Sequence, residues 1–178
     1  MKVVIFGLGY VGFTAACCIA SEGHSVVGID VSEKKVRTIL SGTSPIVEPG
    51  VEEMLQKGLA GGLISADVRI NGHLADADIA IVCVGTPSSA DGSHDMKYII
   101  EVTRQIADAV DKDRAKPLTV AYRSTIRPGT IDGLIEPMFQ ARLGDAAGKL
   151  VQLVYNPEFL RESSAVQDYF EPPKVVIG

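Results

Sequence analysis

The amino-acid sequence contains short apolar runs, rich in Val, Ile and Leu, separated by longer amphipathic stretches. Runs that are apolar at nearly every position, instead of at alternate positions, are typical of parallel strands covered on both faces. Alternation of such strands with helices predicts a doubly wound α/β fold, a mostly parallel Rossmann-like sheet with helices on both faces. The predicted strands are residues 2–6, 25–30, 68–70, 79–84, 118–122, 151–155 and 174–177.

The helical pattern is clearest between residues 97 and 111, where apolar positions recur every three or four residues opposite a charged face. Residues 60–62, Ala-Gly-Gly, mark the exit of an earlier helix. The last predicted strand ends the sequence. We therefore interpret residues 1–178 as one domain from the amino-terminal part of a longer protein.

The composition fits a globular domain and narrows the choice of partners. No apolar run approaches the roughly eighteen residues of a membrane helix, so no membrane partner is expected. A net charge of −5 without a block of Lys or Arg argues against nucleic acid. The three cysteines, Cys17, Cys18 and Cys83, lack metal-binding spacing and lie among apolar residues. We therefore expect reduced core thiols, no metal and a cytoplasmic location.

A glycine motif connects the first predicted strand to the helix that follows. Gly7 permits a tight turn, Gly9 lets the backbone approach a pyrophosphate, and Gly12 lets the helix lie close to the sheet. Asp30 ends the second strand and is suited to accept hydrogen bonds from a ribose diol, which favours NAD over NADP. The alternative is an ordinary strand–helix turn with a surface aspartate.

Two further loops follow predicted strands, and ligands of open α/β sheets bind at these carboxyl ends. After the fourth strand come Gly85, which allows close approach, and Thr86, which offers a hydroxyl. After the fifth come Ser124 and Thr125. The alternatives are a plain turn at Thr86 and helix N-caps at Ser124 and Thr125.

The sixth predicted strand leads into Asn156–Ser163. Pro157 suits the first turn of a helix, so Glu158 and Glu162 are predicted to share one helix face. A carboxylate pair at the mouth of a cofactor site can act as a general base. The alternative is a solvated helix start stabilised by the helix dipole. Residues 44–50, which contain two prolines, have no obvious chemistry of their own.

Together these segments resemble the amino-terminal NAD-binding domain of the UDP-glucose/GDP-mannose 6-dehydrogenases over essentially the whole chain. The segment 156–162 is far more specific than the glycine motif. Residues 44–50 and 86–88 and the closing residues 168–173 look most like the GDP-mannose branch. The matching segments are 6–12, 28–31, 45–50, 82–87, 123–125, 128–130 and 156–162.

The resemblance implies oxidation of a nucleotide-sugar substrate at its C6 hydroxyl to a carboxylate, with two NAD⁺ as cofactor. It also implies a cysteine that holds the aldehyde as a thiohemiacetal and then as a thioester. That cysteine, with the lysine and asparagine that stabilise the oxyanion, would lie in later segments outside this chain. The chain alone is therefore expected to bind NAD and to oxidise nothing. A homo-oligomer is expected.

The resemblance further implies roles for individual residues. Cofactor contacts are implied for Gly7, Gly9, Tyr10, Val11, Gly12, Asp30, Lys35, Thr86 and Thr125. Substrate contacts are implied for Glu158, Phe159, Leu160, Arg161 and Glu162. Catalytic roles are implied for Glu158, Glu162 and Thr125, and which glutamate is the general base stays open.

Three alternative functions stay open at this point. One is a UDP-glucose 6-dehydrogenase, one is a non-catalytic NAD(H)-binding module, and one is another β-hydroxyacid-type dehydrogenase. The two carboxylates, Glu158 and Glu162, favour a nucleotide-sugar dehydrogenase, because a sensor has no use for acids at the reacting end of the cofactor.

Overall fold

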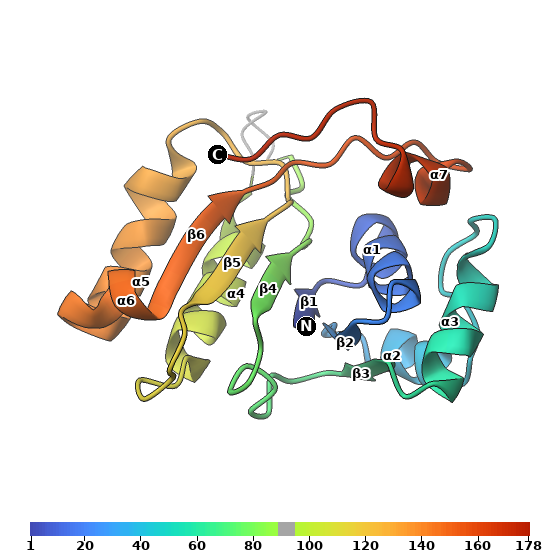
Figure 1. Cartoon of the computed structure of the whole chain (residues 1–178). Coiled ribbons are helices and arrows are strands. Elements are labelled where there is room, and N and C mark those ends of the chain that lie inside the picture. The colour runs from blue at the N-terminus through green and yellow to red at the C-terminus, as the bar shows by residue number, and fades with distance from the viewer. Residues whose placement is uncertain (89–94) are drawn as a thin grey trace.

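The computed structural model describes residues 1–88 and 95–178. In this part of the chain the strands form one parallel sheet in the order β3-β2-β1-β4-β5-β6 (Figure 1). The strands are β1 (Lys2–Phe6), β2 (Ser25–Ile29), β3 (Ile64–Asp67), β4 (Ile79–Val82), β5 (Leu118–Tyr122) and β6 (Val151–Tyr155). The order reverses between β1 and β4, and such a switch point is where open α/β sheets bind ligands.

Helices cover both faces of the sheet (Figure 1). One face carries α1 (Tyr10–Ser21), α2 (Glu33–Leu40), α3 (Val51–Ala60) and α7 (Ala165–Phe170). The other carries α4 (Lys97–Ala109), α5 (Glu136–Leu143) and α6 (Ala147–Leu150), with a π-helical turn, η1 (Ile131–Ile135), and a 3₁₀ turn, η2 (Gly144–Ala146), on either side of α5. The predicted doubly wound fold is confirmed.

The central strand β1 shows why the apolar runs are continuous. Side chains along a strand point to alternate faces, so Val4 and Phe6 enter one core while Val3 and Ile5 enter the other. All four are at most 2% exposed. A strand covered on both faces has no position that favours a polar residue, which is what the sequence pattern indicated.

The third strand was predicted in the wrong place. It is β3, four residues upstream of the predicted 68–70, and it ends at Asp67. There the carboxylate accepts hydrogen bonds from the backbone amides of Val68 (2.6 Å) and Arg69 (3.2 Å) and turns the chain out of the sheet. Local side-chain capping therefore overrides the apolar character of residues 68–70.

The predicted strand 174–177 is also wrong. These residues are irregular, and only Gly178 joins β6, exchanging backbone hydrogen bonds of 2.7 and 2.9 Å with Tyr155. The predicted helix between residues 97 and 111 is confirmed as α4, and α3 ends at Ala60 before Gly61, as the sequence indicated.

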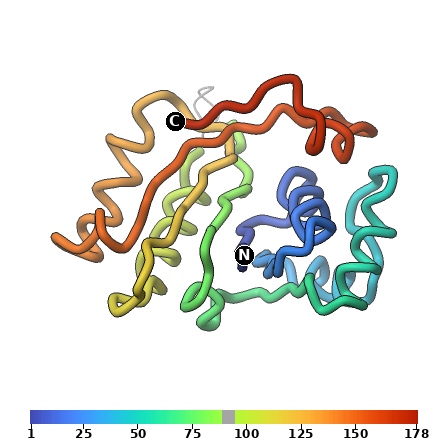
Figure 2. The backbone as a smooth tube through the Cα atoms, viewed as in Figure 1, coloured from blue at the N-terminus to red at the C-terminus, as the bar shows by residue number. Residues whose placement is uncertain are grey.

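The segment after β6 crosses the carboxyl ends of the strands. Figure 2 traces the backbone from β6 along this edge to α7, which lies beside α1. The predicted helix beginning near Pro157 is wrong, because residues 156–161 are irregular and the helix begins only at Ala165.

Candidate functional site

The glycine turn has the geometry that its sequence predicts. Gly7 adopts a φ of 91°, and its amide donates to the carbonyl of Ile29 at 2.8 Å. A Cβ on Gly12 would stand 1.9 Å from the Gly7 carbonyl oxygen and 3.0 Å from the Cβ of Cys83. Only a residue without a side chain lets α1 approach the turn and the end of β4 this closely.

The first turn of α1 is an open set of backbone donors. Gly9 is the N-cap residue and supplies no side-chain hydrogen bond, so in the described residues no side chain caps the helix. The amides of Tyr10, Val11 and Gly12 lack intrahelical partners, as at any helix start. Unpaired amides with a positive helix dipole favour a phosphate group.

Asp30 follows β2 and faces the same turn. One carboxylate oxygen accepts from the amide of Leu8 (2.8 Å) and from Lys35 Nζ (2.6 Å), and the other accepts from the amide of Ser32 (3.0 Å). Burial raises the pKa of Asp30, but the hydrogen bonds from Lys35, Ser32 and Leu8 outweigh it and hold the pKa below its ordinary value. The second oxygen keeps lone-pair capacity for a ligand hydroxyl.

A cleft of about 690 Å³ opens at the switch point of the sheet. It contains several of the predicted cofactor residues, namely Gly7, Gly9, Asp30 and Lys35, together with Gly85. A group with an anionic middle and a ribose diol fits these donors and this acceptor, so the residues present fit a dinucleotide.

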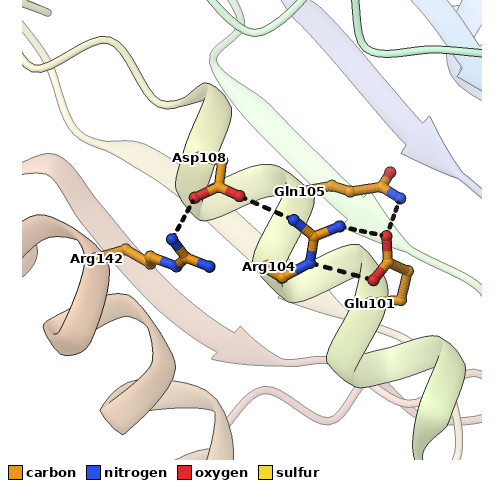
Figure 3. A network of polar contacts seen from close by, with 5 residues as sticks. All are labelled: Glu101, Arg104, Gln105, Asp108 and Arg142. Atoms are coloured by element: carbon orange, nitrogen blue, oxygen red, sulfur yellow. Dashed lines mark hydrogen bonds and ion pairs between the residues drawn. The ribbon is translucent and has the colours of Figure 1, made fainter.

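The opposite wall of the cleft comes from α4, and its charges are paired (Figure 3). Arg104 donates to Glu101 at 2.7 Å and to Asp108 at 3.2 Å, and Gln105 donates to Glu101 at 2.6 Å. Asp108 also meets Arg142 of α5 at 3.4 Å. This exposed network holds two acids of the cleft wall in place beside their cations.

The hydroxyl-bearing loops lie at the same edge of the sheet. Thr86 is half-buried after Gly85, and Thr125 is exposed after β5. The Ser124 hydroxyl donates to the carbonyl of Val84 at 2.6 Å, which ties these two loops together. Ser124 therefore connects neighbouring loops and is not the helix N-cap that the sequence allowed.

The segment that carries the two predicted acids is irregular. Glu158 and Glu162 do not share a helix face, and the Glu158 carboxylate instead accepts from the amide of Leu160 at 2.6 Å. The backbone amide and guanidinium of Arg161 both donate to Asp168, at 2.9 and 2.7 Å. Side-chain carboxylates take the amides that a helix would have used, which is why none forms here.

Glu48, in the loop before α3, is a residue that sequence reasoning missed. It is only 8% exposed, and its carboxylate accepts from the Tyr10 hydroxyl and from the amides of Ser163 and Ala165, both at 2.8 Å. The available signal was an acid between two prolines in an otherwise apolar loop. Such an acid must find donors elsewhere in the chain when it is buried.

The structure leaves the remaining predicted residues outside the cleft. The residues that line it do not include Tyr10, Val11, Gly12, Thr86, Thr125, Glu158, Phe159, Leu160, Arg161 and Glu162. They nevertheless belong to the same edge, because they follow β1, β4, β5 and β6 at their carboxyl ends. Figure 2 shows these ends beneath the segment that leads to α7.

Two of the three cysteines are core residues, as expected, and Cys83 is not. Cys17 and Cys18 are buried in α1, and Cys83 is partly exposed at the wall of the cleft. Burial raises the pKa of each thiol to about 12. At neutral pH they are therefore protonated and poor nucleophiles.

Two features are absent from the part of the chain that the structure describes. Among residues 1–88 and 95–178, no helix has both the length and the apolar character needed to span a membrane. Within the same residues, no three or more His, Cys, Asp or Glu side chains gather as a metal site.

A doubly wound sheet with a glycine turn after β1 and an aspartate, Asp30, after β2 defines a dinucleotide-binding domain of a dehydrogenase. The comparison with family models is more specific: residues 1–178 match the NAD-binding domain of the UDP-glucose/GDP-mannose dehydrogenase family. The chain belongs to this family, and its cofactor is NAD.

Relatives agree over the whole chain. It is 44% identical to the GDP-mannose 6-dehydrogenase of Pseudomonas aeruginosa, covering 100% of this chain and 41% of that protein. It is 35% identical to a UDP-glucose 6-dehydrogenase of Bacillus subtilis, covering 100% of this chain and 39% of that protein. The chain thus spans about two fifths of the length of these relatives.

Solved structures support the same assignment. A ternary complex of GDP-mannose dehydrogenase from Pseudomonas aeruginosa superposes with a TM-score of 0.95 at 44% identity, over 100% of this chain and 41% of the other. A UDP-glucose dehydrogenase from Pyrobaculum islandicum superposes with a TM-score of 0.90 at 36% identity, over 99% and 40%.

Proposed function

We propose that the complete protein containing this chain oxidises the C6 hydroxyl of GDP-mannose to the uronic acid. The observation that carries this proposal is the 44% identity to a GDP-mannose 6-dehydrogenase across all 178 residues. The acid-bearing segment 156–162 supports it, because it crosses the same edge of the sheet as the cofactor turn. The identity to a UDP-glucose 6-dehydrogenase is lower, at 35%.

The cofactor half of the site uses backbone donors and one carboxylate. Bound NAD⁺ supplies the hydride acceptor. Tyr10 and Val11 donate backbone amides to the pyrophosphate, while Asp30 and Lys35 hold the adenosine ribose. Gly7, Gly9 and Gly12 make this approach possible, and Thr86 and Thr125 line the nicotinamide side.

The substrate half of the site uses the irregular segment. Glu158 and Glu162 orient the sugar and accept the proton of its hydroxyl or of the hydrolytic water, and Thr125 is the third catalytic residue. Phe159, Leu160 and Arg161 complete the substrate contacts; the guanidinium of Arg161 is held by Asp168, so its segment is held too.

The oxidation to an acid also needs a nucleophilic thiol. Cys17, Cys18 and Cys83 are protonated and buried or nearly so, and they do not serve. We propose that the nucleophile lies in a later domain, and that residues 1–178 form the NAD-binding domain alone.

The test is an absorbance assay for NADH with the complete gene product. GDP-mannose should yield two NADH per sugar, and UDP-glucose should react at least tenfold more slowly. A preference for UDP-glucose would reassign the substrate, and turnover of neither would favour a non-catalytic NAD(H)-binding module. Residues 1–178 alone should bind NAD⁺ without forming NADH, and sustained turnover by this piece would overturn the missing-nucleophile proposal.

We further propose a cytoplasmic homo-oligomer acting in polysaccharide biosynthesis. The three free cysteines fit a reducing compartment. Exposed apolar side chains such as Val47 (97%) and Val175 (66%) leave surface that a second subunit can cover. Light scattering of the purified protein tests the oligomer, and a monomeric mass would contradict it.

A further inference from the structure

Glu48 is a buried carboxylate that joins three separate parts of the chain. One oxygen accepts from the Tyr10 hydroxyl and from the Ser163 amide at 2.8 Å, and the other accepts from the Ala165 amide at 2.8 Å. The Ser163 amide also reaches the Tyr10 hydroxyl oxygen at 3.1 Å. The first turn of α1 and the start of α7 are therefore bound to the same carboxylate.

The contacts of Glu48 are all hydrogen bonds. No Lys, Arg or His pairs with it in the described part of the chain. A buried carboxylate without a cation depends on each donor it has, because an unsatisfied oxygen carries the full desolvation cost. Burial and the hydrogen bond with Glu48 raise the pKa of Tyr10 to about 12, so this hydroxyl stays a donor at neutral pH.

The backbone at Ser163, whose amide donates to Glu48, is strained. Ser163 has a φ of 68°, in the left-handed region that a non-glycine residue rarely adopts. Such a conformation persists only where the surroundings enforce it. The hydrogen bonds from the Ser163 and Ala165 amides to Glu48 supply that enforcement on one side of α7.

The acid-bearing segment is held at both ends. At its start, the Asn156 amide donates to the Tyr122 carbonyl at 3.0 Å. At its end, Ser163 is bound to Glu48. Glu158 and Glu162 lie between these two points, on backbone without helix or strand to hold it. Between them, the Arg161 amide donates to Asp168 of α7 at 2.9 Å. The position of the acids relative to the first turn of α1 therefore depends on Glu48, which joins Tyr10 to this end of the segment.

We propose that Glu48 is a positioning residue that couples the cofactor turn to the acid-bearing segment, through the Tyr10 hydroxyl on one side and the Ser163 and Ala165 amides on the other. The inference rests on the proposed function of these two regions. In this arrangement an NAD⁺ phosphate at the first turn of α1 stiffens the segment that carries Glu158 and Glu162.

The first test needs no turnover. In the complete protein, NAD⁺ should slow amide hydrogen exchange both at the first turn of α1 and over residues 158–165. Tyr10→Phe removes only the hydroxyl, and the Ser163 and Ala165 amides keep Glu48. The variant should keep the protection at α1 and lose at least half of the added protection over 158–165. Undiminished added protection over 158–165 in Tyr10→Phe would overturn the coupling.

The second test separates kcat from cofactor binding. Glu48→Gln keeps the shape but turns an NH₂ group toward at least one donor, so the acids should shift. A displacement on the order of 1 Å costs about a hundredfold in rate, so kcat should fall roughly ten- to hundredfold while the Kd for NAD⁺ stays within about threefold. Tyr10→Phe should lower kcat less, by about three- to tenfold.

The matched control is Glu52→Gln, an exposed acid that also accepts a backbone amide in this loop, that of Ser44 at 3.0 Å. It should keep wild-type kcat.

A folded Glu48→Gln with unchanged kcat, or with kcat and NAD⁺ affinity falling together, would overturn the positioning role. If Glu48→Gln does not fold, unchanged kcat in Tyr10→Phe overturns it. A wild-type protein inactive on both sugar nucleotides would instead refute the proposed function, and the exchange experiment would still decide the coupling.

Discussion

The cofactor turn and the acid-bearing segment meet at one edge of the sheet but are built in opposite ways. Residues 7–12 are held by their own backbone geometry and by the neighbouring end of β2. Residues 156–164 have no helix or strand after β6 and are held by the carboxylates of Asp168, close in the chain, and Glu48, far from it. The Ala165 amide and Glu48 are 117 residues apart, and the Ser163 amide and the Tyr10 hydroxyl are 153 apart.

This difference shows which substitutions the cofactor turn and the acid-bearing segment each tolerate. The turn is limited by space, since a Cβ at Gly12 meets a backbone oxygen. The segment is limited by hydrogen-bond partners, since Glu48 and Asp168 are both buried and fully engaged. Steric changes should therefore damage the first region, and changes of charge should damage the second.

The largest expected effect is the loss of turnover when an acid of the segment 156–162 is replaced. In the complete protein, Glu158→Gln or Glu162→Gln should lower kcat by about 10²–10⁴, the usual loss of a general base, at nearly unchanged NAD⁺ affinity. Steady-state kinetics and NAD⁺ titration give both values. Wild-type kcat in both single variants would mean that these acids are only a solvated surface.

The next largest effect is a loss of folding stability when a glycine of the cofactor turn, residues 7–12, is replaced. Gly12→Ala places a methyl group 1.9 Å from the Gly7 carbonyl oxygen, so the free energy of unfolding should drop by about 3 kcal/mol or more. Gly9→Ala is the matched control, because no atom lies within 4 Å of its added Cβ. Urea denaturation should show a Gly9→Ala protein of nearly unchanged stability, and NAD⁺ titration should show weakened binding. Equal stability of the two variants would contradict the steric account.

A smaller effect is expected for the ribose acceptor. Loss of a charge-assisted hydrogen bond costs roughly 1.5–3 kcal/mol, so Asp30→Ala should weaken NAD⁺ binding about ten- to a hundredfold. Calorimetry measures this, with NADP⁺ as the comparison ligand. If NADP⁺ bound as tightly as NAD⁺ to the unaltered protein, Asp30 would not be the group that selects a ribose diol over a 2′-phosphate.

The smallest effect is a pH dependence of folding stability that comes from Asp168, the acid that holds Arg161 of the segment. Hydrogen bonds from the Arg161 side chain and amide lower the pKa of Asp168 from 3.8 to about 2. The folded-state pKa is depressed, so the stabilisation is present above about pH 4 and is lost as the pH falls toward 2. Asp168→Asn should flatten this acid limb in urea titrations, whereas the exposed Asp113→Asn should not. An identical limb in Asp168→Asn would rule out this linkage.

Much of the fold followed from pattern alone. Continuous apolar runs located β1, β2, β4, β5 and β6, because strands buried on both faces leave no polar position. The same pattern failed at residues 68–70, where a side-chain carboxylate decided the end of β3. It failed again after Pro157, where the carboxylates of Asp168 and of the distant Glu48 accept the amides of Arg161 and Ser163.

The sequence by itself determined the cofactor turn. Gly7, Gly9 and Gly12 act through backbone shape within a few residues, so their spacing contains the whole structural requirement. Only the tertiary structure decided how the acid-bearing segment is held, because Glu48 gains its partners by folding against α1 and α7. Burial turns an acid in a proline-rich loop into a group that binds both regions, and burial is a property of the packed chain.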